Sequence, residues 1–340
     1  MMQNKKHKPL QNRHIALIGT SGFKGRTLLK KLEADSKIKK LIVIDRKRPP
    51  FELKKAKFYK LDLTENLADA RLAEIFSEEK IHTVIHTAIP SSPPQNNSLS
   101  HEIISVGSMY ICNAAAAAQV QKFILVSSTM VYGAFANNPN FMSETHPLRG
   151  GIKNKFLADK VDAEKSVMKL AQKHPEMTVT ILRTATLIGP TVQSYKTRYL
   201  SRPMLLTILG YDPLIQFLHE DDCIEALQLA VEKDIAGVFN VVAEGVLPLS
   251  RVLHILRKIE FPLPEFIAKN VVQSLWYLNI SPAPKSLLNF LKYLCVADGE
   301  KAKKELGFHP KYSSREALLT FVGAERLRDV ALDIPEEVLS

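Results

Sequence analysis

Short apolar runs alternate with amphipathic segments through the first half of the chain. Five runs have the length and composition of strands: IALIG, LIVID, TVIHTA, KFILVSS and VTILRTA, in chain order. Segments such as TLLKKLEA, between the first two runs, have a helical period. Because the strand runs show little polar alternation, we expect them to be buried on both faces, in a parallel sheet with helices on either side. The pattern predicts an α/β, doubly wound fold.

The regular alternation stops near residue 186, where prolines become frequent and the helical segments more apolar. We therefore expect an α/β domain over residues 13–185, preceded by a basic tail over residues 1–12. Residues 217–243, which contain a further helix and strand pattern, are expected to return to that domain. Residues 186–216 and 244–325 are expected to form a smaller, mostly helical substrate lobe.

A glycine-rich turn follows the first strand run. In IALIGTSGFKG the strand leads directly into a GxxGxxG pattern, and a helical segment follows. Gly19 permits a tight turn, Gly22 lets the backbone approach a pyrophosphate, and Gly25 allows the helix to pack closely on the strand. The unpaired N–H groups of the helix N-terminus favour an anion. This arrangement is typical of a Rossmann-type dinucleotide site, so residues 13–185 are expected to be a dinucleotide-binding domain.

An acidic residue stands at the expected distance from this turn. Asp45 ends the strand run LIVID, about 20 positions after the last glycine, where a carboxylate can bind the ribose hydroxyls of NAD. The same carboxylate repels the 2′-phosphate of NADP. However, Arg46, Lys47 and Arg48 follow it and can accommodate that phosphate. The sequence therefore favours NAD without excluding NADP.

Positive charge is concentrated near this strand. The chain of 340 residues has a formal net charge of +11, and residues 37–60 hold ten lysines and arginines but only two acidic residues. Such a patch attracts nucleic acid, anionic lipid or phosphorylated ligands. The aromatic residues among these charges are too few and too irregularly spaced for a base-stacking platform. We therefore interpret the patch as a solvated face and expect no nucleic-acid partner.

The cysteine and carboxylate patterns argue against a disulfide-rich or metal-binding protein. Cys112, Cys223 and Cys295 are scattered, match no metal-ligand spacing and cannot form a disulfide framework. The run HEDD at residues 219–222 precedes a helix, so Asp221 or Asp222 is expected to cap it, and no metal site is predicted. Charged residues and prolines interrupt the apolar stretch 263–296 before it could span a membrane. We expect a cytoplasmic protein.

The motifs along nearly the whole chain resemble those of the extended short-chain dehydrogenases/reductases, the NAD-dependent epimerase/dehydratase-like group. The matching pieces are GTSGFKG, VIDR, LDL, VIHTA, VSSTMVYG, LRTATLIGP and FLHEDDCIEAL. By this resemblance, Ser128 holds the reacting carbonyl or alcohol and Lys160 is the catalytic lysine. His86, in the run TVIHTA, is interpreted as a packed core histidine. The residues expected to contact the cofactor are Gly19, Ser21, Gly22, Phe23, Lys24, Gly25, Asp45, Arg46, Asp62, Leu63, Thr87, Ala88 and Lys160.

The sequence departs from the family where the chemistry is concentrated. The family's proton donor is a tyrosine four residues before the lysine, and here that position is Phe156. Ile104 stands where the preceding helix often carries an asparagine, and Thr186 stands where sugar-modifying members carry another. The nearest tyrosine in sequence, Tyr132, aligns with a structural tyrosine and is a poor substitute.

Two functions therefore remain open. One is an oxidoreductase or epimerase of non-standard catalysis, acting on an unidentified small molecule. The other is a catalytically inactive dinucleotide-binding sensor or scaffold. The resemblance also implies a possible homodimer. Peripheral contact with lipid is a further hypothesis, because Trp276, Tyr277, Phe290 and Tyr293 lie among basic residues.

Overall fold

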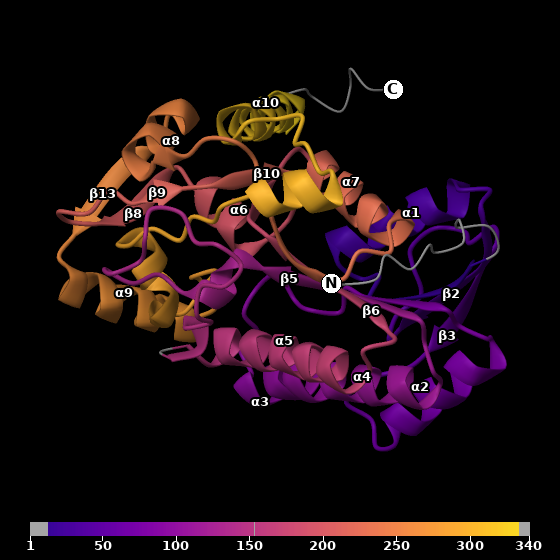
Figure 1. Ribbon diagram of the computed structural model, residues 1–340. Coiled ribbons are helices and arrows are strands. Elements are labelled where there is room, and N and C mark those ends of the chain that lie inside the picture. The colour runs from indigo at the N-terminus through magenta and orange to yellow at the C-terminus, as the bar shows by residue number, and fades with distance from the viewer. Residues whose placement is uncertain (1–12, 153, 333–340) are drawn as a thin grey trace.

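The computed structural model describes residues 13–152 and 154–332, and the predicted basic tail lies outside them. Its centre is a parallel seven-stranded sheet in the order β11-β6-β5-β4-β1-β2-β3 (Figure 1). This confirms the α/β, doubly wound fold expected from the apolar runs. The strands are β1 (Arg13–Ile18), β2 (Ile38–Asp45), β3 (Ala56–Lys60), β4 (Thr83–His86), β5 (Lys122–Ser128), β6 (Thr178–Thr184) and β11 (Gly237–Val241).

Helices cover both faces of the sheet, and each face has its own hydrophobic cluster. On one face lie α2 (Ala68–Glu78), α4 (Gly107–Ala117) and α5 (Lys155–Lys173). On the other face lie α1 (Phe23–Ala34) and α7 (Glu220–Glu232) (Figure 1). Before α4 the chain forms α3 (Asn97–His101) and a short π-helix, Glu102–Val106. Burial on both faces explains why the central strands read as nearly continuous apolar runs.

The order of the strands creates a crevice. Strand β1 pairs with β2 on one side and with β4 on the other, so the chain changes direction in the sheet between β1 and β4. Open parallel sheets bind ligands outside the carboxyl ends of their strands at such a reversal. The glycine turn after β1 and the loop after β4 meet at this point.

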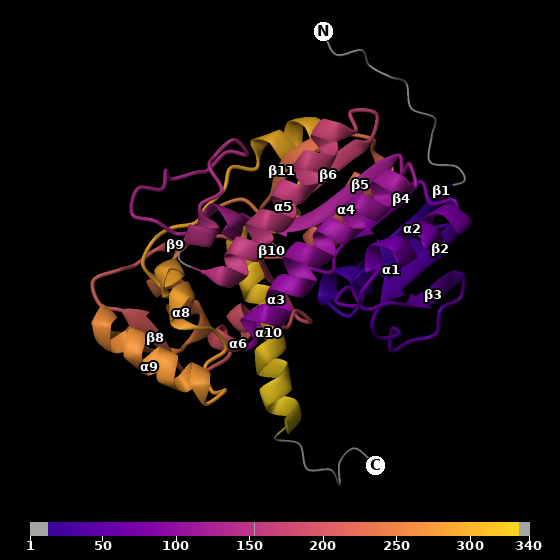
Figure 2. The same ribbon diagram turned by 90° about the horizontal axis from the view of Figure 1, so that it is seen from below.

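The remaining elements form a smaller group beside the sheet (Figure 2). Three two-stranded pairs, β7–β10, β9–β12 and β8–β13, accompany its helices. Two separate hydrophobic clusters hold this group together. We refer to it as the helical lobe. The domain boundaries expected from the sequence stay a prediction. The elements of the helical lobe are β7 (Thr186–Ile188), α6 (Tyr195–Leu200), β8 (Met204–Ile208), β9 (Leu214–Ile215), β10 (Phe217–His219), β12 (Leu247–Pro248), α8 (Leu249–Leu256), β13 (Ile259–Leu263), α9 (Glu265–Tyr277), α10 (Ser314–Leu332) and the 3₁₀ turn Lys285–Leu291. The 3₁₀ turns Thr129–Tyr132 and Gly150–Ile152 contact α5, and a π-helix, Ala302–Leu306, contacts β11, so these three lie with the sheet and not in the helical lobe.

None of the helices within the described residues is both long and apolar enough to cross a bilayer. Nor do the described residues contain a group of three or more histidines, cysteines or carboxylates arranged to hold a metal ion.

Part of the basic patch is paired with a buried carboxylate. Glu79, which follows α2, accepts hydrogen bonds from Lys40 of β2 and Lys57 of β3 at 2.5 and 2.6 Å, and from the Tyr59 hydroxyl. These bonds, first that of Lys40, lower the pKa of Glu79 to about 2. The patch is therefore less free for an anionic partner than its sequence suggests.

This carboxylate predicts a dependence of stability on acidity. Because the pKa of Glu79 is lower in the folded than in the unfolded chain, its stabilising contribution is complete above about pH 5 and is lost as the pH falls towards 2. We expect the free energy of unfolding, measured with urea, to fall over that range by more in the wild type than in Glu79→Gln. Equal decreases in both proteins would contradict this.

Candidate functional site

A cavity of about 450 Å³ lies at the carboxyl ends of the central strands. It is bordered by the glycine turn after β1, the ends of β2, β5 and β6, the loop after β4, and the first residues of the helical lobe. The structure brings all the predicted cofactor contacts and both predicted polar catalytic residues to its wall. They are Gly19, Ser21, Gly22, Phe23, Lys24, Gly25, Asp45, Arg46, Asp62, Leu63, Thr87, Ala88, Ser128 and Lys160.

The three glycines of the turn have different surroundings. Gly19 has a φ of +90°, and a Cβ there would lie 2.4 Å from the backbone of Ala88. A Cβ on Gly25 would lie 2.0 Å from the carbonyl oxygen of Gly19 and 2.6 Å from the Thr87 hydroxyl, which itself bonds that carbonyl. Gly22, by contrast, lines the cavity and has no atom within 4 Å of its Cβ position. Gly19 and Gly25 are thus required for packing, whereas Gly22 keeps space open in the cavity.

The start of α1 suits an anion. Gly22 caps this helix without a side-chain hydrogen bond, and the first turn holds no acidic residue. Its N–H groups and the positive end of the helix dipole are therefore available to a phosphate. With the space left by Gly22, the turn fits the pyrophosphate of a dinucleotide.

Asp45 does more than line the cavity. Its carboxylate accepts hydrogen bonds from the backbone N–H groups of Thr20 and Ser21, at 2.6 and 2.8 Å, and from the Ser21 hydroxyl at 3.0 Å. The acidic residue therefore fixes the conformation of the turn while presenting negative charge to the cavity. Arg46 lies beside it, 3.8 Å from the carboxylate of Asp62.

Lys160 and Ser128 face the cavity from α5 and the end of β5. The Lys160 ammonium donates to the carbonyl oxygen of Pro90 at 2.8 Å and lies 4.6 Å from the centre of the Phe156 ring. Burial, together with the nearby charges of Lys24 and Lys196, holds the pKa of Lys160 well below its usual value. Phe156 itself is 3% exposed, belongs to the core beneath the sheet, and is not among the residues that line the cavity.

The structure adds two residues that the sequence analysis missed. Tyr195 and Lys196 open α6 and line the cavity from the helical lobe. The Lys196 amine donates to the Thr186 hydroxyl at 2.6 Å, and burial lowers its pKa to about 8. Burial raises the pKa of the Tyr195 phenol, which contacts the sulfur of Met130. The only sequence signal was a capping box at the start of α6, formed by Ser194 and Thr197.

Three lysines thus face one cavity without acidic partners. Within the part of the chain that the structure describes, Lys24, Lys160 and Lys196 form no ion pair. Burial lowers the pKa of all three, and the charges of Lys24 and Lys196 lower that of Lys160 further. The wall is therefore suited to an anionic ligand, and it holds amines that can change protonation near neutral pH.

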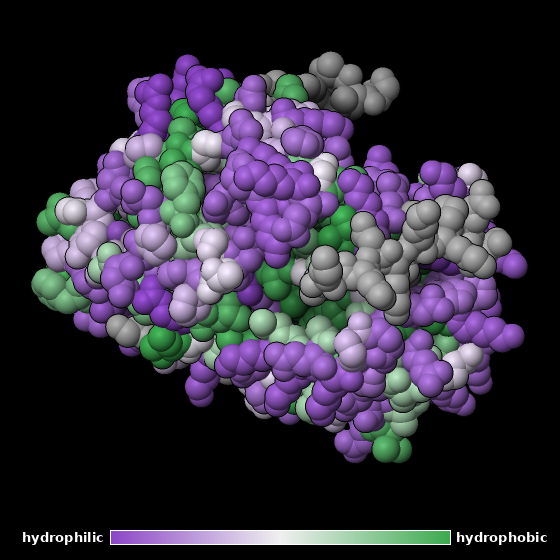
Figure 3. Space-filling model, viewed as in Figure 1, coloured by the Kyte–Doolittle hydropathy of each residue, from purple (hydrophilic) through white to green (hydrophobic). Residues whose placement is uncertain are grey.

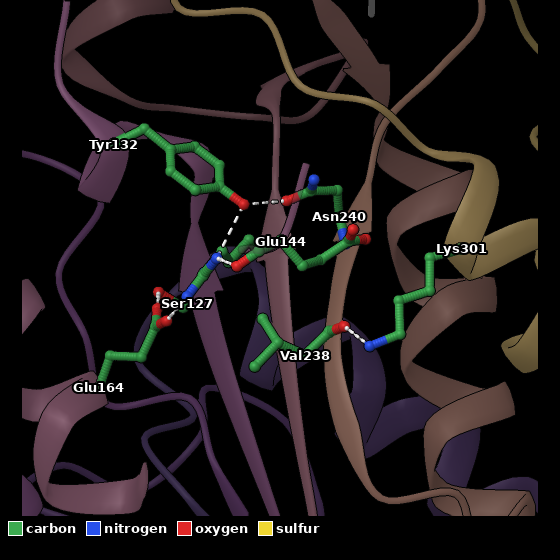
Figure 4. Close-up of polar contacts among 8 residues, drawn as sticks. Ser127, Tyr132, Glu144, Glu164, Val238, Asn240 and Lys301 are labelled. Atoms are coloured by element: carbon green, nitrogen blue, oxygen red, sulfur yellow. Dashed lines mark hydrogen bonds and ion pairs between the residues drawn. The ribbon is translucent and has the colours of Figure 1, made fainter. Parts of the chain in front are cut away.

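Tyr132 lies elsewhere, in a buried polar cluster (Figure 4). Its hydroxyl donates to Asn240 at 2.7 Å and accepts from the Arg183 guanidinium at 2.8 Å. Arg183 forms an ion pair with Glu164, and both are almost completely buried. Burial raises the pKa of Tyr132 to about 12. This tyrosine is held within the buried cluster and does not line the cavity.

Two histidines singled out in the sequence are also structural. His86 is fully buried beside the Ser108 hydroxyl, and burial lowers its pKa to about 3. The expectation that Asp221 or Asp222 caps α7 is wrong. His219 is the capping residue and accepts from the N–H of Asp221, because the carboxylate of Asp222 instead holds the backbone N–H groups of Lys311 and Tyr312.

Comparisons with known proteins extend these observations. Residues 15–242 match the model of a family described as the NAD dependent epimerase/dehydratase family. An uncharacterized protein of Mycobacterium tuberculosis (strain ATCC 25618 / H37Rv) is 30% identical over 311 residues, which cover 89% of this chain and 81% of that protein.

Solved structures share the fold over almost the full length. MoeE5, in complex with UDP-glucuronic acid and NAD, superposes with a TM-score of 0.73 at 20% identity, covering 93% of this chain and 99% of MoeE5. DesIV from Streptomyces venezuelae, a dTDP-glucose 4,6-dehydratase with NAD bound, superposes with a TM-score of 0.71 at 17% identity, covering 94% and 98% of the two chains.

Proposed function

The chain belongs to the NAD dependent epimerase/dehydratase family, and from this premise we propose that it binds NAD in the cavity at the carboxyl edge of the sheet and uses it to oxidise or reduce a small molecule. The observation that carries the proposal is the convergence on one cavity of the glycine turn, Asp45, Ser128 and Lys160. These residues come from the ends of three separate strands and from α5, yet they line a single space large enough for a ligand.

The cofactor is held by groups that the sequence supplies locally. The N-terminus of α1 and Lys24 would hold the pyrophosphate, and the carboxylate of Asp45 would hold the adenosine ribose. The negative charge of Asp45 disfavours a 2′-phosphate, so NAD is the preferred form. Leu63 and Ala88 line the cavity and would add apolar contacts to the flat rings of the cofactor.

The chain's own residues must hold and move a proton. Bound NAD supplies the hydride acceptor, so that an alcohol carbon loses hydride and the hydroxyl loses a proton as a ketone forms. The hydroxyl of Ser128 would orient the reacting oxygen, and the Lys160 amine would donate a hydrogen bond to it as it becomes negative. Lys196, with its pKa of about 8, accepts the proton in place of the absent phenol. Reduction of a ketone runs the same transfers in reverse.

A second function has one specific observation in its favour. Phe156, at the position of the family's proton donor, is packed into the core and has no hydroxyl. A protein that binds NAD without turnover would act as a sensor or scaffold whose state follows cofactor occupancy. Both functions require NAD binding, and only the enzyme requires turnover of a substrate.

Thermal denaturation with NAD, NADH, NADP and NADPH tests the binding step. We expect the melting temperature to rise with NAD and NADH at concentrations well above the dissociation constant, because a ligand that binds only the folded state stabilises it. NADP and NADPH should give smaller shifts. No shift with any of the four would overturn the proposal and the sensor alternative together.

Replacing Ser128 by alanine tests catalysis. With a panel of nucleotide sugars and secondary alcohols, we expect turnover by the wild type and a loss of about a hundredfold or more in kcat/KM for Ser128→Ala. The thermal shift with NAD should stay the same. Phe156→Tyr provides the contrast. If the wild type binds NAD but turns over nothing, and activity arises only in Phe156→Tyr, the protein is the sensor and not the enzyme.

A further inference from the structure

A second cavity of about 330 Å³ adjoins the first and lies within the helical lobe. The two cavities share Met130, Thr186, Tyr195 and Lys196 in their walls. We infer that this second cavity holds the hydrocarbon body of the substrate, so that the protein acts on an apolar alcohol or ketone and not on a nucleotide sugar. This inference rests on the proposed function, because the reacting carbon must face the first cavity.

The wall of the second cavity is mainly aliphatic and aromatic. Side chains from β8, α8, α9 and the turn Lys285–Leu291 surround it. Lys196 and Arg202 are the charged residues in the wall, and no acidic residue lines it among those that the structure describes. An apolar wall of this kind stabilises hydrocarbon by removing it from water.

Most polar groups in this wall already have partners within the protein. The Tyr199 hydroxyl donates to the carbonyl of Leu206 at 2.7 Å, and the Ser281 hydroxyl donates to that of Ala283 at 2.7 Å. The amide of Gln216 accepts from the N–H of Ala297 at 3.0 Å and donates to its carbonyl at 3.1 Å.

Few groups therefore remain to bind the base, ribose and phosphates of a nucleotide. A polar group buried without a hydrogen bond loses its interactions with water and gains nothing in return. A nucleotide would bring many such groups into this cavity. The same wall accepts a hydrocarbon without that penalty.

Lys196 marks the polar end of the site. Its amine bonds the Thr186 hydroxyl where the two cavities meet, and both residues face the first cavity as well. A substrate with its oxygen at this pair would place its remaining carbon atoms among the apolar side chains. The substrate is thus expected to have one oxygen-bearing end and a hydrocarbon body.

The apolar wall continues to the surface, which provides a path for such a molecule. Val271 of α9, Phe261 of β13 and Met204 of β8 line the cavity and are also exposed, by 37%, 44% and 51%. Figure 3 shows hydrophobic residues on the surface where these elements lie. Of the four aromatic residues noted in the sequence, Phe290 and Tyr293 line the cavity, whereas Tyr277 is exposed.

Binding of two separate ligands tests the inference. The fluorescent apolar probe N-phenyl-1-naphthylamine reports the second cavity, and NAD titrated by calorimetry reports the first. We expect 2-undecanone to displace the probe and UDP-glucose to leave it bound. Val272→Trp, which fills the cavity from α9, should weaken the probe at least tenfold and change the affinity for NAD by less than twofold. Ser274→Trp, on the same helix but outside the wall, should change neither.

The outcomes separate the two claims. Displacement of the probe by UDP-glucose, or equal probe affinity in Val272→Trp and the wild type, would overturn the apolar substrate while NAD binding upholds the proposed function. Probe binding without NAD binding would instead refute the proposed function. Should Val272→Trp fail to fold, Val271→Glu at the mouth of the cavity replaces it, with Ser274→Glu as its control. A carboxylate at the mouth of the cavity should also lower the affinity for the probe at least tenfold.

Discussion

Gly25→Ala is expected to lower the free energy of unfolding by about 3 kcal/mol or more and to abolish measurable NAD binding. The added methyl group would lie 2.0 Å from the carbonyl oxygen of Gly19, a distance at which the backbone of the turn must move. Thr87, whose hydroxyl bonds the same carbonyl, would be displaced as well. The change therefore affects the helix, the turn and the loop after β4 together.

Gly22→Ala is the matched control. Its methyl group enters open space, so we expect the free energy of unfolding to change by about 1 kcal/mol or less. NAD affinity should nevertheless fall about tenfold, because the methyl group occupies the space where the backbone approaches the pyrophosphate. Thermal denaturation and calorimetric titration of both variants measure the two effects. For a chain of this size, 3 kcal/mol corresponds to a decrease of roughly 4 °C in the melting temperature. Equal stability of the two variants would contradict this account.

The sequence predicted the features that depend on local spacing. The glycine turn, the strand before it and Asp45 at the end of the next strand can be recognised because their positions follow from one strand–helix–strand unit. The parallel sheet follows from apolar runs that are buried on both faces. These features place the cofactor half of the candidate site.

The substrate half depends on contacts between distant segments, which no local pattern reveals. Lys196 reaches the cavity because the chain after β7 folds over the end of the sheet, and Thr186 is brought beside it by this path. The second cavity is enclosed by segments from residue 129 to residue 295. The capping of α7 by His219 was missed for a similar reason, since Asp222 is occupied by backbone groups 89 and 90 residues further along the chain.

The buried ion pair of Arg183 and Glu164 is a further case of distant contact. The sequence shows Arg183 within an apolar strand run but does not reveal which acidic residue will pair with it. In the fold, β6 places it beneath α5, where Glu164 receives its guanidinium Nε–H at 2.8 Å and the Ser127 hydroxyl at 2.7 Å (Figure 4). Tyr132 bonds the same guanidinium at 2.8 Å. The cluster links the ends of β5 and β6, and thereby the positions of Ser128 and of the cavity wall.

Glu164→Leu is expected to lower the free energy of unfolding by about 3–5 kcal/mol, because it leaves the Arg183 guanidinium buried without its counter-charge. Arg183→Met should have a similar effect through the unpaired carboxylate. The double variant Glu164→Leu/Arg183→Met removes both charges, so its loss should be smaller than the sum of the two single losses by about 2 kcal/mol or more. Urea denaturation of the four proteins at neutral pH closes the double-mutant cycle. Strictly additive losses would mean that the two side chains act independently and that the ion pair does not stabilise this part of the fold.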